Sequence, residues 1–354
     1  MNPLHLRKGE HVSSDESQSS GQTLQTRSGR RTRSSEATGN SLASGDRAGA
    51  GLDRGFAGLA RFAGIGILII LAFVAFFLVY NSWGAVYHDQ DGQADSASFH
   101  IGEFISHAWP LVIGTLIVSV IALLIAAPVA IGVALYISHY APPRASRSIG
   151  YVIDLLAAIP SVVYGAWGMT FLAPQLVPLY NWLNEYLGWI PIFGGSPSPT
   201  GRTIITAGVV LSVMVLPIIT SVCREIFIQT PKLHEEAALA LGATRWEMIT
   251  MTVLPFARGG IISGIMLGLG RALGETMAVV LVLSSGPIAW SIIQSGRHDT
   301  IPSNIASNFP ESREGSVHWH ELIAIGLVLF VITLLVNMLA RWIVSRHKEF
   351  SGAN

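Results

Sequence analysis

Two residues of opposite charge stand inside an otherwise apolar stretch in the second half of the chain. Arg271 and Glu275 belong to the segment GLGRALGETMAVV, within an apolar run from Ile261 to Leu283. A charge at the centre of a membrane costs about 2.5–3.5 kcal/mol on the insertion scale, so such residues usually serve a function. Because the two are four residues apart, the pattern predicts that they share one face of a helix and neutralise each other.

Glycines share this predicted face. Gly260, Gly264 and Gly268 recur at four-residue spacing ahead of Arg271, and small residues at that spacing let a second helix approach closely. The pattern therefore predicts that the pair faces a neighbouring helix or a polar passage. An arginine there offers a planar fork of donors that fits the oxygens of an oxyanion. The alternative is that the pair only fastens this helix to a partner protein.

The elements that would position this pair are membrane helices. Half of the 354 residues are apolar and 12% are charged, which is the composition of a membrane protein. Six apolar runs are long enough to cross about 30 Å of hydrocarbon at about 20 residues each. They are approximately Phe62–Trp83, Leu111–Ile137, Ile149–Leu172, Ile204–Val222, Ile261–Leu283 and Leu322–Val344.

Lys and Arg are unevenly distributed among the connections. Of the 22 such residues, the three connections on one side of the membrane hold only Arg202, Arg297 and Arg313. The positive-inside rule therefore predicts that both termini are cytoplasmic. The first sixty residues are rich in Ser, Thr, Gly and Arg and poor in Leu, Ile, Val and Phe, which indicates a disordered tail.

These patterns divide the chain into segments. We expect a disordered cytoplasmic tail over residues 1–60 and a first transmembrane helix with an outer loop over 61–107. A transmembrane core is expected over 108–345, with a cytoplasmic loop at 224–257, followed by a cytoplasmic C-terminus at 346–354.

Prolines interrupt two of the predicted spans, Pro160 in the third and Pro217 in the fourth. A proline inside a helix frees a carbonyl one turn earlier, and in a membrane that carbonyl needs a donor. Ser161 and Tyr164 lie within a turn of Pro160. Their hydroxyls are candidates for that donor, or for a polar lining of the passage.

The cytoplasmic loop contains a pattern for a first short helix. Thr230 is a predicted cap, and Pro231 fits the first helical position, where a missing N–H costs nothing. Leu233, Ala237 and Leu241 repeat at four-residue spacing. They predict an apolar ridge on one face of that helix.

A second short helix is predicted directly after the first. Gly242 can adopt the left-handed conformation that ends the first helix. Thr244 and Glu247 have the spacing of a capping box for the second, which should stop near Pro255. The result would be a two-helix projection suited to docking a soluble partner.

This loop resembles the EAA loop of type I ABC importer permeases, whose pattern is E-A-A, three residues, G, nine residues, I, any residue, L-P. The matching positions here are Glu236, Ala237, Ala238, Gly242, Leu254 and Pro255. Thr252 stands where the pattern has Ile, which concerns one contact beyond the main projection. The resemblance implies that these residues couple the chain to a cytoplasmic ATPase.

Three further segments, IPSVVYG (159–165), LPIITS (216–221) and GLGRALGETMAV (268–279), resemble the C-type permeases of phosphate-specific ABC importers. The resemblance covers roughly Leu111 to Trp342. It implies an all-α, polytopic protein of the bacterial plasma membrane with six transmembrane helices and the type I ABC importer permease (MetI-like) fold. Arg271, Glu275, Ser161 and Tyr164 would line the pathway of inorganic phosphate.

The resemblance also implies partners. These are a homologous A-type permease forming a heterodimer, a dimer of cytoplasmic ATPases and an extracytoplasmic phosphate-binding protein, with no role for nucleic acid. The chain lacks the G-x-x-x-x-G-K-[ST] pattern of the phosphate-binding loop, so ATP and Mg²⁺ would be used by the ATPase partner. We expect a transporter subunit and not an enzyme, with no cofactor, catalytic residue or metal site of its own.

Other functions stay open at this point. The chain could be an ABC permease for another oxyanion, such as sulfate or molybdate, which competition of labelled phosphate uptake would reveal. A self-sufficient secondary transporter would show internal repeats with broken helices in both halves, and it would transport without an ATPase. A membrane subunit that signals phosphate status is compatible with transport.

Overall fold

The computed structural model describes residues 36–83, 87–88, 98–99, 101–283, 291–294 and 299–346. Most of these residues are helical. In the described part, strands are confined to one antiparallel pair, β1 (Tyr87–His88) and β2 (Ser98–Phe99), with Tyr87 opposite Phe99. The segment 346–354 predicted as a C-terminus lies outside the described residues except for Arg346.

Six helices are long and apolar enough to cross a membrane, as the sequence predicts. Their spans are Gly55–Ser82, Ile101–Tyr140, Ser161–Leu187, Ile204–Ile228, Arg245–Leu273 and Val317–Ile343. The third and fifth spans differ most from the expected ranges. Both differences bear on the candidate site.

The first span belongs to helix α1 (Glu36–Ser82). This helix begins within the segment 1–60, for which the composition predicts disorder, while residues 1–35 lie outside the described part. Extending an existing helix costs little, because each added residue gains a hydrogen bond without a new nucleus. The chain divides into two compact units after Ile69, and the helices considered below belong to the second unit.

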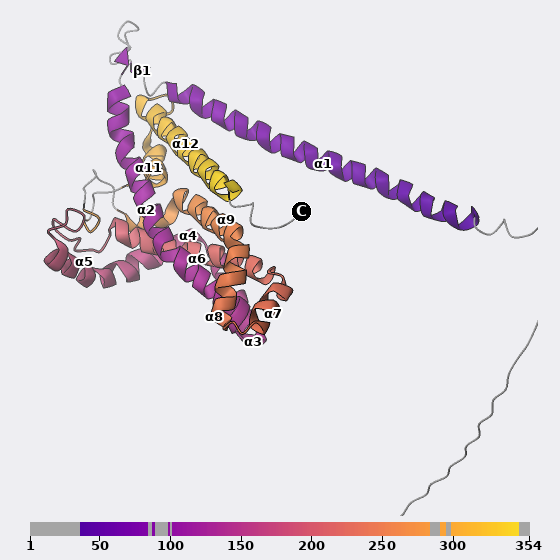
Figure 1. The fold of residues 1–354 in the computed structure, drawn as a ribbon. Coiled ribbons are helices and arrows are strands. Elements are labelled where there is room, and N and C mark those ends of the chain that lie inside the picture. The colour runs from indigo at the N-terminus through magenta and orange to yellow at the C-terminus, as the bar shows by residue number, and fades with distance from the viewer. Residues whose placement is uncertain are drawn as a thin grey trace, which may run out of the picture. The chain divides into compact units, whose positions relative to one another are not determined.

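Helices α2 (Ile101–Leu135) and α6 (Ile204–Ile228) form the centre of the second unit (Figure 1). The buried face of α2 presents alanine at every fourth position. Ala122, Ala126, Ala130 and Ala134 are fully buried. On α6, a side chain at Gly208 would collide with Ile121 of α2. Small residues on both helices therefore set their close approach.

The predicted glycine stripe is confirmed on α9 (Leu254–Leu273), which packs against the other side of α6. Positions 260, 264 and 268 of α9 each face an apolar side chain of α6. A Cβ at Gly264 would lie 3.3 Å from Val222, and one at Gly268 would lie 2.7 Å from Val215. The absence of side chains at these positions lets α6 sit directly on α9.

The third predicted span, Ile149–Leu172, is wrong as a single helix. The chain forms α3 (Pro143–Ala157), α4 (Ser161–Trp167), a π-helical segment η3 (Gly168–Leu172) and α5 (Ala173–Leu187). The break falls at Ile159–Pro160, because the ring of a proline clashes with the residue before it and disfavours the helical conformation of that residue. The membrane span starts only after the proline, at Ser161.

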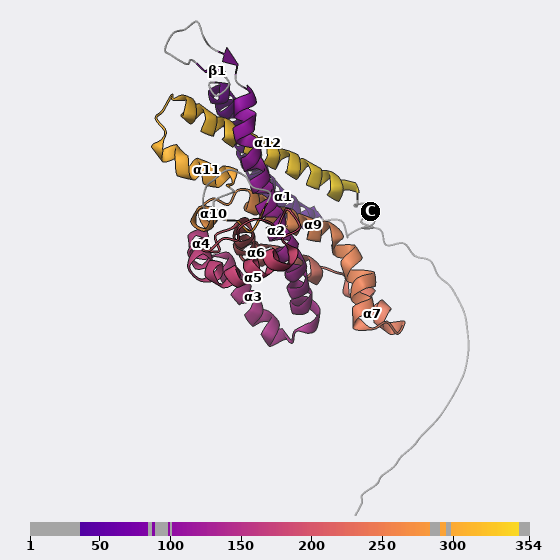
Figure 2. The same ribbon diagram turned by 90° about the vertical axis from the view of Figure 1, so that its left-hand side faces the viewer.

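The remaining helices close the unit on two sides. Figure 2 shows α10 (Met277–Val282) beside α4, and α7 (Lys232–Ala240) at the end of the unit where α3 also lies. The last span belongs to the long helix α12 (Val317–Arg346). The short elements of the described part are η2 (Tyr136–Tyr140), α8 (Arg245–Met248), η4 (Ile249–Val253), α11 (Ile301–Asn308) and η5 (Phe309–Glu311).

A matched pair of glycines on α2 tests how closely this helix packs against the segment just before α11. A Cβ at Gly114 would overlap the backbone carbonyl of Asp299, whereas Gly132 has open space around it. Gly114→Ala should lower the free energy of unfolding by about 1–3 kcal/mol, the usual cost of overpacking. Gly132→Ala should be neutral or slightly stabilising, since alanine favours a helix. Thermal unfolding in detergent compares the two, and equal melting temperatures would contradict the packing.

Candidate functional site

The predicted pairing of Arg271 and Glu275 on one helix face is wrong. Helix α9 ends at Leu273, Gly274 follows as its C-cap, and α10 starts at Met277. Glycine has low helix propensity, and Gly270 and Gly274 both stand in this last turn. Within the described residues, no hydrogen bond or ion pair joins the two charged side chains.

Each charged residue has its own environment. Glu275 is 8% exposed, and its carboxylate accepts a hydrogen bond of 3.1 Å from the N–H of Ala278 in the first turn of α10. A carboxylate at a helix start is favoured by the unsatisfied N–H groups there. Arg271 is exposed. The break thus anchors the acid and leaves the guanidinium free to turn toward another group.

Both residues line one cavity of about 950 Å³ between α9 and α12. Its polar lining comes from both helices and from the break that follows α9. The lining side chains with polar groups are Ser263, Arg271, Glu275, Asn337, Arg341 and Ser345. Two guanidinium groups and one carboxylate give the lining a net positive charge. Hydroxyl and amide donors beside them complete a set suited to an oxyanion.

Arg341 is the residue of this cavity that sequence reasoning missed. It lies inside the sixth apolar run, on the face of α12 that looks toward Arg271 across the cavity. The signal was present, because an arginine within a predicted span is a candidate functional residue by the same rule that singled out Arg271. Its nearness to the end of the run made it resemble part of the positive C-terminal flank.

Ser161 and Tyr164 do not reach this cavity. Ser161 opens α4, and Tyr164 is 7% exposed. The Tyr164 hydroxyl donates a 2.8 Å hydrogen bond to the Leu156 carbonyl at the end of α3. Of the two roles open to the Tyr164 hydroxyl, the geometry favours satisfying a carbonyl freed at the helix break.

The coupling segment, residues 230–255, projects an apolar face. Leu233 and Leu241 are 77% and 90% exposed, and Ala237 between them is also exposed. Glu236 is also exposed, while Ala238 packs against the core. A leucine with nine-tenths of its surface exposed indicates a surface awaiting a partner.

The caps of the coupling segment agree with the sequence except at its start. Gly242 has φ +90°, as predicted for the residue that ends α7. The Thr244–Glu247 capping box is present. The predicted cap at Thr230 is wrong: Pro231 holds the cap position, and the Thr230 hydroxyl is buried without a hydrogen-bond partner among the described residues.

The predicted stop near Pro255 is also wrong. Helix α8 continues through the π-helical segment η4 into α9, so that the span runs unbroken from Arg245 to Leu273. Pro255 lies directly after the π-helical segment η4, near the start of α9. Leu254 packs against the core. At 1.5 Å per residue, a helical rod of about 44 Å joins the projecting segment to the cavity.

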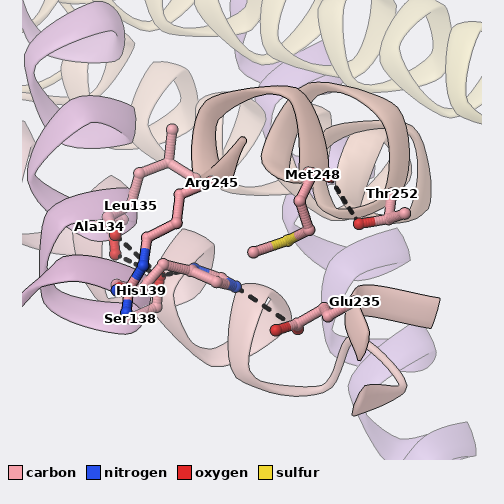
Figure 3. Close-up of polar contacts among 8 residues, drawn as sticks. All are labelled: Ala134, Leu135, Ser138, His139, Glu235, Arg245, Met248 and Thr252. Atoms are coloured by element: carbon pink, nitrogen blue, oxygen red, sulfur yellow. Dashed lines mark hydrogen bonds and ion pairs between the residues drawn. The ribbon is translucent and has the colours of Figure 1, made fainter. Parts of the chain in front are cut away.

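A buried contact ties α7 to the core (Figure 3). Nε2 of His139, at the end of η2, lies 3.5 Å from Oε1 of Glu235, and the two side chains are 8% and 22% exposed. The Ser138 hydroxyl donates to the Ala134 carbonyl, so Nδ1 of His139 is the donor to Ser138 Oγ at 2.7 Å. Both ring nitrogens of His139 therefore lie within reach of an oxygen atom on a neighbouring side chain.

Arg245 strengthens this contact from the other short helix. Its Nη1 donates a 3.4 Å hydrogen bond to the His139 carbonyl (Figure 3). The segment η2 is thus joined to α7 through Glu235 and to α8 through Arg245. We call His139, Glu235 and Arg245 the coupling clamp.

Replacing His139 with alanine should loosen α7 without unfolding the core. Glu235 would lose its only ion-pair partner among the described residues, a loss of about 1–2 kcal/mol. We expect amide hydrogen exchange in Lys232–Ala240 to become about tenfold faster. The control is His318→Ala, which removes an exposed His318–Glu321 pair of the same 3.5 Å length. Unchanged exchange in α7 would contradict the clamp.

Comparisons with known proteins agree with this architecture. The family described as "Binding-protein-dependent transport system inner membrane component" matches residues 126–349. A Mycobacterium tuberculosis protein named "Phosphate transport system permease protein PstC 2" is 44% identical over 296 residues, covering 82% of this chain and 90% of that protein. The PstC protein of Mesorhizobium japonicum is 36% identical, covering 85% of this chain and 92% of its own.

A solved structure shares the fold. A chain of a bacterial ABC transporter involved in import of the acidic polysaccharide alginate superposes with a TM-score of 0.52 at 20% identity, covering 79% of this chain and 93% of its own. At that identity the likeness concerns the fold alone. Six apolar helices, the EAA-type segment and these matches coincide along the chain. The chain belongs to the family of binding-protein-dependent transport system inner membrane components, the permeases of ABC importers, and its relatives there are PstC proteins.

Proposed function

We propose that this chain is the C-type permease subunit of an ATP-driven importer of inorganic phosphate and forms half of its translocation pathway. The observation that carries the proposal is the cavity that brings Arg271 and Arg341 together between two membrane helices. Phosphate carries one to two negative charges and sheds water on entering the membrane. Two guanidinium groups replace that water with charge-assisted hydrogen bonds.

The carboxylate of Glu275 offsets part of the positive charge of the cavity. Arg271 and Arg341 each carry one positive charge and Glu275 carries one negative charge, so the lining has a net charge of +1. A site with one net positive charge holds a monovalent anion weakly enough to release it, as a transporter requires. The Glu275 carboxylate is buried and accepts a hydrogen bond from the Ala278 N–H, and this position keeps it from turning toward the anion.

The coupling segment is the proposed contact for the ATPase. Glu236, Ala237, Ala238 and Gly242 belong to the projecting part, and Leu254 and Pro255 join it to α9. Closure of the ATPase dimer would move this projection, and the unbroken helix to Leu273 would carry the movement to the cavity. A rigid element with two positions is the physical basis for coupling at a distance.

Membership of this family makes the chain a transport component and not an enzyme, with a separate ATPase and a substrate-binding protein as partners. We further propose a homologous A-type permease as the other half of the pathway, an extracytoplasmic phosphate-binding protein, and use of ATP and Mg²⁺ by the ATPase alone. The chain is a multi-pass inner membrane protein. The distribution of Lys and Arg supports cytoplasmic termini.

Uptake by the reconstituted complex tests the substrate. The chain is co-expressed with its companion subunits, reconstituted in liposomes with ATP inside, and supplied with labelled phosphate and its binding protein. Uptake should need ATP and resist a hundredfold excess of sulfate or molybdate. Competition by either anion would favour the other-oxyanion function, and flux through the chain alone would favour a secondary transporter.

A further inference from the structure

A second cavity, of about 330 Å³, lies at the other end of the helices, between α3 and α6. It holds more than ten times the roughly 30 Å³ that a water molecule occupies in the liquid. Two arginines from different helices line it, together with one carboxylate and two hydroxyl groups. The lining residues are Pro143, Ser146, Arg147, Gly150, Tyr151, Asp154 and Arg224. None of them takes part in the phosphate cavity or the coupling clamp.

Arg224 is the central residue of this cavity. Its guanidinium lies flat on Gly150, where an added Cβ would come within 2.8 Å of Nη1. Its Nε is buried and has no hydrogen-bond partner among the described residues. A buried donor left without an acceptor costs about 1–3 kcal/mol. The position therefore calls for an acceptor that enters from outside the chain.

The acid of the cavity does not supply that acceptor. Arg147 stands two turns before Asp154 on α3, at a spacing that would allow an ion pair. In the described part of the chain, no ion pair forms between Asp154 and either Arg147 or Arg224, although all three line the cavity. Two cations and one anion leave a net charge of +1. That charge matches a phosphodiester, which carries one negative charge.

The cavity also sits at a membrane boundary. Helix α3 begins just after the span that ends at Tyr140, and Arg224 lies near the end of the span Ile204–Ile228. The neighbouring face of α3 exposes Tyr151, Val152 and Leu155 by 68%, 54% and 69%. An amphipathic helix with basic residues beside exposed apolar ones lies in the headgroup region of a bilayer.

We propose that this cavity binds a phosphate group, held by Arg224 and Arg147, and that the group is the headgroup phosphate of an anionic phospholipid. Arg224 donates to the phosphate oxygens from the floor on Gly150, and Arg147 donates from the rim. The exposed side chains of Tyr151, Val152 and Leu155 lie where the acyl chains would run. This site fixes α3 at the bilayer surface beside the end of α6.

Lipid counting on the intact complex tests the site. The chain is purified in detergent with its companion subunits, stripped of lipid and mixed with phosphatidylglycerol or phosphatidylcholine. Native mass spectrometry then counts the bound lipids. Arg224→Gln should reduce binding of phosphatidylglycerol about tenfold, because it removes charged hydrogen bonds. Asp154→Asn should increase that binding, since it removes the opposing charge.

The control is Arg144→Gln, an exposed arginine of α3 that does not line the cavity. It removes the same charge from the same helix and should leave the number of bound lipids unchanged. Gly150→Ala keeps every charge but displaces the guanidinium, so it should weaken binding as Arg224→Gln does. Elution volume and melting temperature of each variant confirm that it is folded.

Inorganic phosphate distinguishes the two sources of the ligand. If the lipid is the ligand, millimolar phosphate should not displace phosphatidylglycerol, and calorimetry with phosphate should give no heat that depends on Arg224. Displacement by phosphate would support the phosphate site with the free anion as its ligand. The proposal is overturned if Arg224→Gln and Asp154→Asn bind both probes as the wild type does, or if Arg144→Gln loses as much as Arg224→Gln.

Discussion

Arg271→Ala should reduce phosphate uptake at least tenfold while the complex still assembles. The side chain is exposed to the cavity and has no ion-pair partner among the described residues, so its loss leaves no charge unpaired and creates no hole in the core. Hydrogen bonds to a charged group are worth about 1.5–3 kcal/mol, which is tenfold to hundredfold in rate when they are made in the transition state. Uptake of labelled phosphate into cells or liposomes measures the effect.

The matched control for this variant is Arg258→Ala, which removes an exposed arginine from the same helix outside the cavity. Arg341→Ala should reduce uptake in the same direction as Arg271→Ala, because the two guanidinium groups face one space. Normal uptake by Arg271→Ala, at normal abundance in the membrane, would refute the assignment. If Arg258→Ala reduced uptake as much as Arg271→Ala does, the effect would come from the total positive charge of α9 and not from the position of Arg271 in the cavity.

Leu241→Asp should detach the ATPase from the permease. The side chain is 90% exposed, so the substitution should leave the stability of the chain nearly unchanged. In the complex a buried leucine contributes about 1.5–3 kcal/mol, and a carboxylate placed in an apolar cleft costs more. The affinity should therefore fall about tenfold to a hundredfold. Co-purification of the tagged ATPase and phosphate-stimulated ATP hydrolysis measure the loss.

Lys232→Asp is the control, because it places the same side chain at an exposed position of α7 that lies off the face carrying Leu233, Ala237 and Leu241. It should keep most of the ATPase. Retention of the ATPase by Leu241→Asp, with normal stimulated hydrolysis, would show that this ridge is not the docking surface. The His139→Ala variant should fall between the two, since it loosens α7 without altering its outer face.

Signals that depend on neighbouring residues were readable from the sequence. The left-handed Gly242, the Thr244–Glu247 box and the glycine stripe on α9 are each specified within a few residues. Apolar length gave the number of spans. These features follow from backbone geometry and local hydrogen bonding, so no distant contact is needed to predict them.

Features that depend on tertiary contacts were not readable in the same way. The apolar pattern is the same whether the helix continues through Glu275 or ends before Gly274. The chain ends the helix there, and the next helix, α10, packs against α4. Arg341 joins Arg271 only because α12 returns beside α9. His139 and Glu235 lie 96 positions apart and meet because α7 lies beside η2.

The π-helical turn at Ile249–Val253 has a consequence for the phase between the two ends of the long rod. A π turn holds an additional residue compared with an α turn, and each residue of an α-helix rotates the chain by about 100°. Removing one amino acid from this turn would convert it to ordinary α-helix, and Arg271 would keep nearly the same azimuth relative to the projecting ridge, because the wider turn takes up the additional residue by itself. The same residue inserted into ordinary α-helix would rotate Arg271 by about 100°. The π turn therefore preserves the direction in which the guanidinium points while it lengthens the chain between Gly242 and Arg271 by one residue.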